Sequence, residues 1–261
     1  MDRLKLSFLG GIALGLSLAS SPTGAHAGPL GNQGVSPKII GGSVISDRNS
    51  PVVLLETDVA TCTGTLIAPK VVLTASHCVK DTFPGPVITP SRIKVVFNGR
   101  RIGVTRIMTH RQSNLVNDPN RLQDLALLFL KKKVQTNPVP ILLSRDLSQG
   151  DLIRLVGYGE SYDFHTGALH EGYAHVDQIW KKFIRIKIKQ GESSACVGDS
   201  GGPVISKYVD ANGVEHSGLV GTVFGGDSEE CRVGESAYYT RLQTSTAASF
   251  ILHNVPGVEV Q

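Results

Sequence analysis

The chain has 261 residues, of which 41% are hydrophobic and 18% are charged. This composition is that of a folded protein with a core, and it excludes a disordered chain. The formal net charge of +4 gives no reason to expect a nucleic-acid partner, and the length suits one large all-β unit or two small domains.

The first residues have the pattern of a secretory signal. Arg3 and Lys5 precede an apolar stretch from Leu6 to Leu18, and a small-residue cleavage pattern follows at Ala25-His26-Ala27. This pattern predicts a signal peptide over residues 1–27. A membrane anchor is the alternative, but the apolar stretch is too short to span a bilayer comfortably. We therefore expect a secreted protein, extracellular or periplasmic, with no membrane contact in its mature form.

Residues 28–38 are rich in glycine and proline, and their apolar residues show no helical or strand periodicity. This composition indicates a flexible leader between the signal and the folded domain. Residues 1–38 together contain three basic residues and one acidic residue. Their removal lowers the formal net charge from +4 to +2, so the mature chain is only weakly basic.

Short apolar or alternating runs follow one another after the leader, separated by turn-forming clusters, as in a β-sandwich or β-barrel. The predicted strands are Val52–Leu55, Thr65–Ile67, Val71–Thr74, Ile93–Phe97, Val104–Met108, Leu125–Leu130, Leu152–Val156, Ile184–Lys189, Val204–Ser206, Leu219–Phe224 and Ala237–Leu242. In Ile184–Lys189 strict alternation predicts that the isoleucines face the core and the basic residues face solvent. One helix is predicted, over Thr244–His253.

Two basic runs, Lys131–Lys133 and Lys181–Lys182, have two interpretations. They could form exosites for a partner, or they could lie in solvated loops. Solvated loops are the more common outcome for such runs, and we expect that outcome here.

The four cysteines of an exported chain are expected to pair. Three connectivities are possible, and the pairs Cys62–Cys78 and Cys196–Cys231 would each close a local loop. Metal binding is the alternative. Because no C-x-x-C or H-x-x-x-H spacing accompanies the cysteines, we expect no metal site.

The segment Gly198-Asp199-Ser200-Gly201-Gly202-Pro203 places a serine between glycines, where a substrate backbone can approach closely and backbone N–H groups can point at a reacting oxygen. Four further segments occur with it in a characteristic order: Ile39-Ile40-Gly41-Gly42, Thr74-Ala75-Ser76-His77-Cys78, Asp124-Leu125-Ala126-Leu127-Leu128 and Ala237-Tyr238-Tyr239-Thr240. Together the five segments resemble the trypsin and chymotrypsin family of serine endopeptidases over residues 39–261.

The resemblance implies an all-β fold of two six-stranded antiparallel barrels with a short C-terminal helix. The barrel boundary is expected near residues 131–140, and the active site is expected in the cleft between the barrels. The first barrel would carry His77 and Asp124, and the second would carry Ser200. The chain is expected to be a monomer that acts on protein or peptide substrates without a cofactor.

The resemblance also implies roles for single residues. Ser200 would be the nucleophile, His77 the general base and then acid, and Asp124 the buried carboxylate that orients the imidazole. The backbone N–H groups of Gly198 and Ser200 would bind the oxyanion.

The resemblance further implies a zymogen. An activating protease would cut after Lys38, and the new ammonium group of Ile39 would pair with Asp199 to order the oxyanion loop. The disulfide Cys62–Cys78 would hold the loop of His77, and Cys196–Cys231 would clamp the walls of the substrate pocket.

The resemblance places Ser194 at the floor of the specificity pocket. Ala195 and Ala237 would make this pocket small to medium and apolar, and we expect cleavage after apolar or aromatic residues. The segment Val223-Phe224-Gly225-Gly226 departs from the family's Ser-Trp-Gly pattern: Phe224 replaces either the serine or, with one residue deleted, the tryptophan. Both alignments remove a hydroxyl that contacts the catalytic aspartate in the family. The acidic segment 227–230 that follows lies just before Cys231. It could favour basic groups near the mouth of the pocket, but we expect a solvated loop.

Two other functions use the same residues. The segment around Ser200 also satisfies G-x-S-x-G, the nucleophile elbow of esterases, with Asp227 and His253 in the required order. That elbow needs a following helix, which Gly201-Gly202-Pro203 opposes. The second alternative is a catalytically weak or silent binding protein on the protease scaffold, suggested by the altered region at Phe224.

Overall fold

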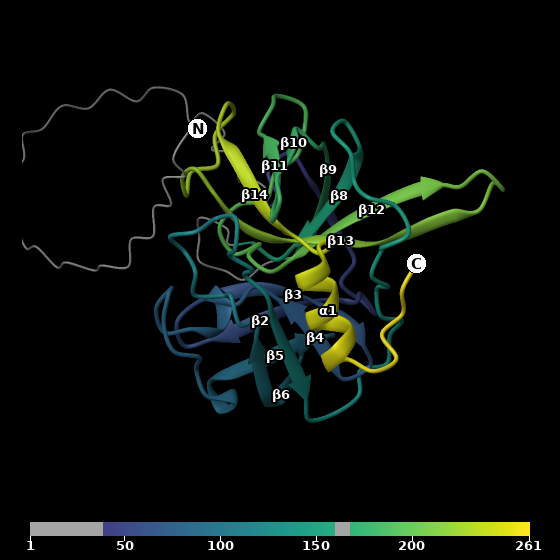
Figure 1. Ribbon diagram of the computed structural model, residues 1–261. Coiled ribbons are helices and arrows are strands. Elements are labelled where there is room, and N and C mark those ends of the chain that lie inside the picture. Colours follow the sequence, from purple (N-terminus) through teal and green to yellow (C-terminus); the bar gives the residue numbers. More distant parts are fainter. Residues whose placement is uncertain (1–38, 160–167) are drawn as a thin grey trace, which may run out of the picture.

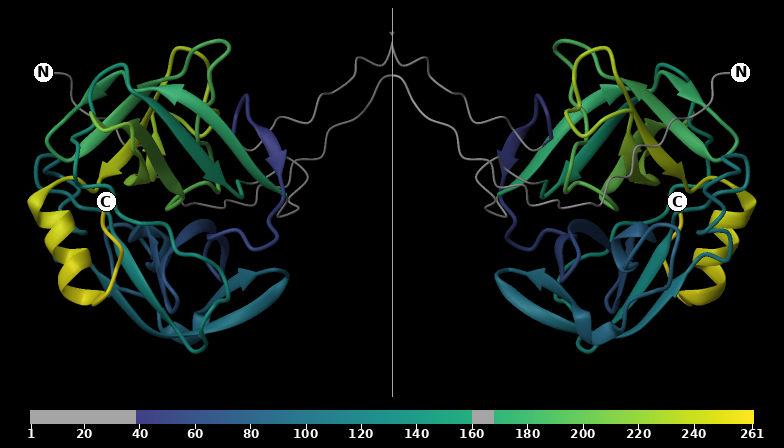
Figure 2. Two further views of the ribbon diagram at one scale, coloured as in Figure 1. Left: turned by 90° about the vertical axis from the view of Figure 1, so that its right-hand side faces the viewer. Right: turned by 90° about the vertical axis from the view of Figure 1, so that its left-hand side faces the viewer.

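The computed structural model describes residues 39–159 and 168–261, and these form two β-sheet halves with one α-helix beside them (Figure 1). The predicted signal peptide and leader, residues 1–27 and 28–38, lie outside the described residues. Figure 2 shows the two halves one above the other, with the helix α1 (Ser245–Asn254) along one side.

The first half is a closed barrel with the strand order β2-β3-β4-β7-β6-β5, in which every neighbouring pair is antiparallel. Valine, isoleucine and leucine fill its strands, and such side chains pack well on a pleated, buried surface. Its core contains Val53, Leu55, Val72 and Leu128, none of which is exposed to solvent. The strands are β2 (Val52–Thr57), β3 (Thr61–Ala68), β4 (Val71–Thr74), β5 (Ile93–Phe97), β6 (Arg100–Thr109) and β7 (Ala126–Leu130).

The second half is an eight-stranded antiparallel sheet with the order β1-β9-β8-β12-β13-β14-β11-β10. It differs from the expected six strands by two short strands at its ends. The strands are β1 (Ser43–Ile45), β8 (Leu152–Gly157), β9 (Leu169–His175), β10 (Gln178–Ile179), β11 (Phe183–Lys187), β12 (Pro203–Val209), β13 (Glu215–Gly226) and β14 (Ser236–Arg241). The two-part, all-β architecture predicted from the sequence is confirmed.

Three of these strands, β1, β9 and β10, were not predicted from the sequence. The first and last are very short, and the strand β9 reads LHEGYAH, with polar residues and a glycine interrupting any apolar pattern. Strand β1 pairs with β9, so the beginning of the described chain belongs to the second sheet. The predicted boundary at 131–140 falls in the connection between Leu130 and Leu152.

The alternation predicted over Ile184–Lys189 is confirmed, because all three isoleucines are buried and Lys187 and Lys189 are exposed. The neighbouring run needs a correction. Lys182 is not a solvated side chain but is buried, and its ammonium group donates a hydrogen bond to Thr246 Oγ1 of α1. Burial lowers the pKa of Lys182.

The helix α1 begins after Thr244, whose hydroxyl caps it by accepting a hydrogen bond from the Ala247 N–H at 3.2 Å. The predicted range Thr244–His253 is therefore confirmed to within one residue. The apolar side of the helix packs on a cluster that contains residues of both halves, including Leu73, Leu127 and Leu219. The helix therefore fixes the first barrel against the second sheet. Among the described residues, we find no helix long and apolar enough to cross a bilayer.

Candidate active site

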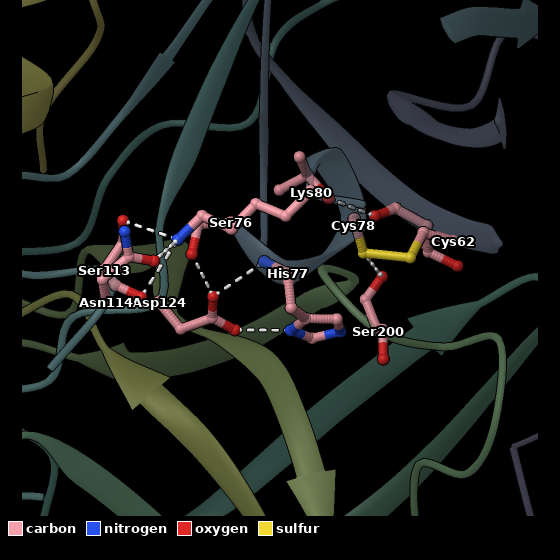
Figure 3. Close-up of polar contacts among 11 residues, drawn as sticks. Cys62, Ser76, His77, Cys78, Lys80, Ser113, Asn114, Asp124 and Ser200 are labelled. Carbon is pink, nitrogen blue, oxygen red and sulfur yellow. Dashed lines mark hydrogen bonds and ion pairs between the residues drawn. A yellow bond between two sulfur atoms is a disulfide. The ribbon is translucent and has the colours of Figure 1, made fainter. Parts of the chain in front are cut away.

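His77 and Asp124 meet in the first barrel. His77 begins the short 3-10 helix η1 (His77–Val79) directly after β4, and Asp124 lies two residues before the neighbouring strand β7. His77 Nδ1 lies 2.6 Å from Asp124 Oδ2, and the backbone N–H of His77 donates to Asp124 Oδ1 at 3.0 Å (Figure 3). The Asp124 side chain is fully buried, while the His77 side chain keeps 14% of its surface exposed.

A third donor to this carboxylate was not predicted. Ser76 Oγ donates a hydrogen bond to Asp124 Oδ1, and both residues are fully buried. Burial by itself raises the pKa of Asp124, but the His77 ring, the Ser76 hydroxyl and the His77 N–H outweigh it and hold the pKa below its ordinary value. The carboxylate is therefore charged, and each of its contacts favours the charged form.

Ser200 faces the same imidazole from the second sheet. Figure 3 shows it on the side of the ring away from Asp124, and Ser200 and His77 line one cavity of about 330 Å³, called here the Ser200 cavity. Gly198 and Gly201 beside it have φ angles of +85° and +78°. Side chains rarely adopt this left-handed region, so both positions require glycine. Ser200 therefore lies in a tight turn between Gly198 and Gly201.

Thr63 of β3 joins this turn to the first barrel, and the sequence contained no sign of it. Its N–H donates to the Ser200 carbonyl at 2.9 Å, and its hydroxyl donates to the Gly198 carbonyl at 3.1 Å. The same hydroxyl accepts from the Tyr158 N–H at 3.0 Å. The two halves approach so closely here that a Cβ on Gly201 would lie 2.6 Å from the Thr63 carbonyl oxygen.

Both disulfides border the Ser200 cavity. Cys62 is bonded to Cys78, the residue after His77, and Cys196 is bonded to Cys231. Cys62 and Cys78 also lie within 4.8 Å of a His77 nitrogen, a spacing that could suit a metal ion. Because both sulfurs are in a disulfide, neither is available as a thiolate ligand.

Ile39 and Asp199 are both fully buried. Ile40 and Ser194 exchange backbone hydrogen bonds of 2.8 and 3.0 Å, which anchor the start of the described chain beside the segment that leads to Ser200. The Asp199 carboxylate accepts from the Gly159 N–H at 2.9 Å and from the Cys196 N–H at 3.0 Å.

The residues expected to form the specificity pocket divide into two groups. Ala195, Phe224, Gly225 and Gly226 line the Ser200 cavity. Ser194 and Ala237 do not line it: both are buried, and the Ser194 hydroxyl donates to the Ala195 carbonyl at 3.2 Å. The cavity also has lining residues that the sequence did not reveal, namely Val59, Ala60, Thr61 and Val197. Val223 lines it beside Phe224. The acidic segment expected to be a solvated loop contributes Ser228 and Glu229 to the cavity lining.

Phe224 is buried at a β-bulge in strand β13. Its ring centroid lies 6.2 Å from that of His77 and 5.1 Å from that of Phe183. An apolar ring therefore packs beside the imidazole, and the hydroxyl contact to Asp124 comes from Ser76.

A buried lysine lies behind Asp124. Lys80 is 3% exposed, and its ammonium donates to Ser113 Oγ at 2.9 Å and to Asn114 Oδ1 at 2.6 Å (Figure 3). Burial lowers the pKa of Lys80, and the charge of Asp124 opposes that shift. A lysine after a cysteine and a valine has no recognisable pattern, so the sequence did not single it out.

The segment after Ser200 excludes the esterase elbow. Strand β12 begins at Pro203, where the elbow requires a helix. The described residues contain a single α-helix, at the C-terminal end of the chain, so the alternating strands and helices of the esterase fold are absent from the part that the structure describes.

Residues 39–251 match the family model described as Trypsin. The chain is 31% identical to serine protease SP24D of Anopheles gambiae over 64% of this chain and 67% of that protein. It is 27% identical to a vitellin-degrading protease of Bombyx mori, covering 74% and 78% of the two chains. It is also 27% identical to glucanase inhibitor protein 3 of Phytophthora infestans, covering 69% and 73%.

Among solved structures, a Glu endopeptidase in complex with MPD is similar to this chain with a TM-score of 0.61. It has 17% sequence identity and covers 82% of this chain and 95% of that one. At this identity the likeness concerns the fold alone.

Proposed function

Because the chain belongs to the trypsin family, we propose that it is a secreted serine endopeptidase, made as a zymogen, that hydrolyses peptide bonds through Ser200, His77 and Asp124. The observation that carries the proposal is the 2.6 Å contact between His77 and Asp124 on one side of the imidazole, with Ser200 on the other. The substrates would be proteins or peptides.

The first half of the reaction forms an acyl-enzyme. Ser200 Oγ attacks the scissile carbonyl carbon while His77 removes the hydroxyl proton, and the carbonyl π electrons move to the oxygen. The backbone N–H groups of Gly198 and Ser200 stabilise this oxyanion, each worth a few kcal/mol in comparable enzymes. The imidazolium then gives its proton to the leaving amine as the C–N bond breaks.

The second half releases the acid product. Water attacks the ester carbon and passes a proton to His77, and the imidazolium returns that proton to Ser200 Oγ as the ester bond breaks. Asp124 stays ionised throughout. Its contact with Nδ1 selects the tautomer whose other nitrogen can accept the serine proton.

Activation requires cleavage after Lys38. The ammonium group released on Ile39 would then compensate the buried charge of Asp199, whose neighbour Gly198 provides an oxyanion donor. Support comes from the burial of both residues, since a cation beside a buried carboxylate offsets part of the cost of burying its charge. N-terminal sequencing of the active protein should begin at Ile39, and a Lys38→Gln chain should remain intact and inactive.

The Ser200 cavity supports cleavage after apolar or aromatic residues. Ala195, Val223 and Phe224 give it apolar walls, and Gly225 and Gly226 leave it open. Hydrolysis of a diverse peptide library tests this preference. Dominant cleavage after lysine or arginine would overturn it and would assign a selecting role to Glu229 of the cavity lining.

A catalytically silent binding protein is the second candidate. It is favoured by the apolar Phe224 beside His77 and by the similarity to a protein named as a glucanase inhibitor. The two candidates differ in whether Ser200 reacts.

A fluorophosphonate probe on the Lys38-cleaved protein separates the candidates, with Ser200→Ala as the matched variant. We expect stoichiometric labelling of the wild type and none of the variant. A folded, cleaved protein that fails to react would overturn the peptidase proposal and support the binding protein.

A further inference from the structure

A second cavity, the basic groove, lies on the first barrel. It has a volume of about 730 Å³ and shares no lining residue with the Ser200 cavity. Three separate segments contribute to it: the β1–β2 connection, the β5–β6 hairpin and the chain after β7. Its lining residues are Asp47, Arg48, Asn49, Phe97, Asn98, Arg100, Arg101, Ile102, Lys132, Lys133, Val134 and Gln135.

Five cationic side chains and one carboxylate line the basic groove. Arg101 is paired with Glu56, and its Nε lies 2.5 Å from Glu56 Oε2. The other four cations, which are Arg48, Arg100, Lys132 and Lys133, form no ion pair within the described part of the chain. A concave surface lined mainly by one sign of charge concentrates ions of the opposite sign. The groove is therefore suited to an anion.

The walls of the basic groove are held by a pair of asparagines. Asn49 and Asn98 adopt left-handed backbone conformations, with φ angles of +58° and +47°. The Asn49 N–H donates to Asn98 Oδ1 at 2.9 Å, and Asn98 Nδ2 donates to Asn49 Oδ1 at 3.1 Å. Thr136, which follows the lysines, donates to the Asn49 carbonyl at 2.5 Å. These hydrogen bonds join all three segments, so the backbone that carries the cationic side chains is held in place before a ligand binds.

The lining also indicates the kind of anion. Arginine forms paired hydrogen bonds with planar or tetrahedral oxyanions such as sulfate and phosphate groups. None of the groove's apolar residues is among the exposed large hydrophobic side chains, and Phe97 and Ile102 pack against the barrel core. An acidic peptide partner ordinarily needs apolar or aromatic anchors, and single-stranded nucleic acid needs exposed aromatic rings for stacking.

We propose that the basic groove is an exosite for a sulfated polysaccharide, bound by Arg48, Arg100, Lys132 and Lys133. The site is independent of the peptidase chemistry, because the two cavities have no residue in common. Binding there would localise the protein on a sulfated matrix while leaving Ser200 accessible. The lysines of the run Lys131–Lys133 are exposed, as expected, and the proposal gives a ligand to Lys132 and Lys133.

Titration of the full chain with size-defined heparin tests the proposal. We expect saturable binding that weakens as salt is added. The Lys132→Ala, Lys133→Ala double variant should weaken binding by about tenfold, since each exposed pair contributes modestly. The matched control is Lys187→Ala with Lys189→Ala, which removes two exposed lysines outside the groove and should leave binding unchanged. Equal losses in both double variants would overturn the proposal, because they would reflect net charge alone.

A second variant tests the hydrogen bonds between Asn49 and Asn98 without changing the net charge. The double variant Asn49→Gly, Asn98→Gly permits the same φ angles and removes the hydrogen bonds made by the two side-chain amides. It should weaken heparin binding. Urea unfolding of the same variant should show that the chain still folds. Chemically desulfated heparin, poly-glutamate and a DNA oligonucleotide are the competing probes. Binding of any of these as tightly as heparin would overturn the assignment to a sulfated polysaccharide.

Discussion

The Ser76→Ala substitution tests how the buried carboxylate of Asp124 is supported. The hydroxyl of Ser76 is one of three donors to this carboxylate, and the other two belong to His77. Asp124 is fully buried, so solvent cannot reach it readily to replace a lost donor. The substitution therefore removes one contact and leaves the His77 pair in place.

The magnitude follows from the charge of the acceptor. A hydrogen bond to an ionised group contributes about 1.5–3 kcal/mol, and about 1.4 kcal/mol corresponds to tenfold in rate. We expect kcat to fall by about tenfold to a hundredfold with little change in KM, because the weakened carboxylate orients His77 less well during proton transfer.

Stability should change with a specific pH dependence. The pKa of Asp124 is lower in the folded chain than in the unfolded chain, where it is near 3.8. This difference stabilises the folded chain at pH values above the unfolded pKa, and the stabilisation is lost as the pH falls through the folded pKa. Without the Ser76 donor the folded pKa rises. The variant should therefore be less stable than wild type near neutral pH, and the difference should shrink under acidic conditions.

The assay combines steady-state hydrolysis of a peptide substrate, corrected for the fraction of reactive Ser200, with urea unfolding at several pH values. Ser206→Ala is the control, since Ser206 is a buried serine on β12 outside the site. Unchanged kcat in the Ser76→Ala protein, or a stability loss that does not depend on pH, would refute the reasoning.

Three further substitutions test other contacts. Thr63→Val removes the hydroxyl that donates to the Gly198 carbonyl and accepts from the Tyr158 N–H. At about 1 kcal/mol for the neutral bond to Gly198, kcat/KM should fall about fivefold; an unchanged rate would contradict the proposed support of the turn that contains Gly198 and Ser200. Burial lowers the pKa of His110 below 6.5, so the unfolded chain binds more protons and stability falls as the pH drops through that value. His110→Gln should flatten this dependence in urea unfolding, and identical pH profiles would argue against it. Replacing Cys196 and Cys231 by alanine opens a loop with a sequence separation of 35 and should cost about 4 kcal/mol, measured by urea unfolding; a loss near zero would contradict the loop-closure estimate.

Predictions from the sequence succeeded where a local pattern reflects a local physical requirement. The apolar run Val71–Thr74 became strand β4 with the same bounds, and the isoleucines of Ile184–Lys189 all face the core. The prediction failed for β9, because LHEGYAH lacks an apolar pattern and forms a strand through its partners β8 and β1. It also failed for Lys182, whose burial depends on the position of α1.

The candidate site divides in a similar way. His77, Asp124 and Ser200 stand in recognisable segments, and their roles remain proposals that labelling will test. Ser76 also stands in a recognisable segment, but its contact with Asp124 was not predicted. Thr63 and Lys80 stand in no such segment, and each acts through a partner remote in sequence. The exclusion of Ser194 and Ala237 from the cavity lining is likewise a matter of how the walls pack.

The sequence by itself determined the family resemblance, most strands, the helix and the residues expected to react, because periodicity and short motifs are local properties of the chain. The tertiary structure alone decided which hydroxyl supports Asp124, which residues line the Ser200 cavity and which cations converge on the basic groove. These depend on distances between segments that are far apart along the chain. Asn49 and Asn98 are separated by 49 positions, and only the closing of the first barrel brings their amides together.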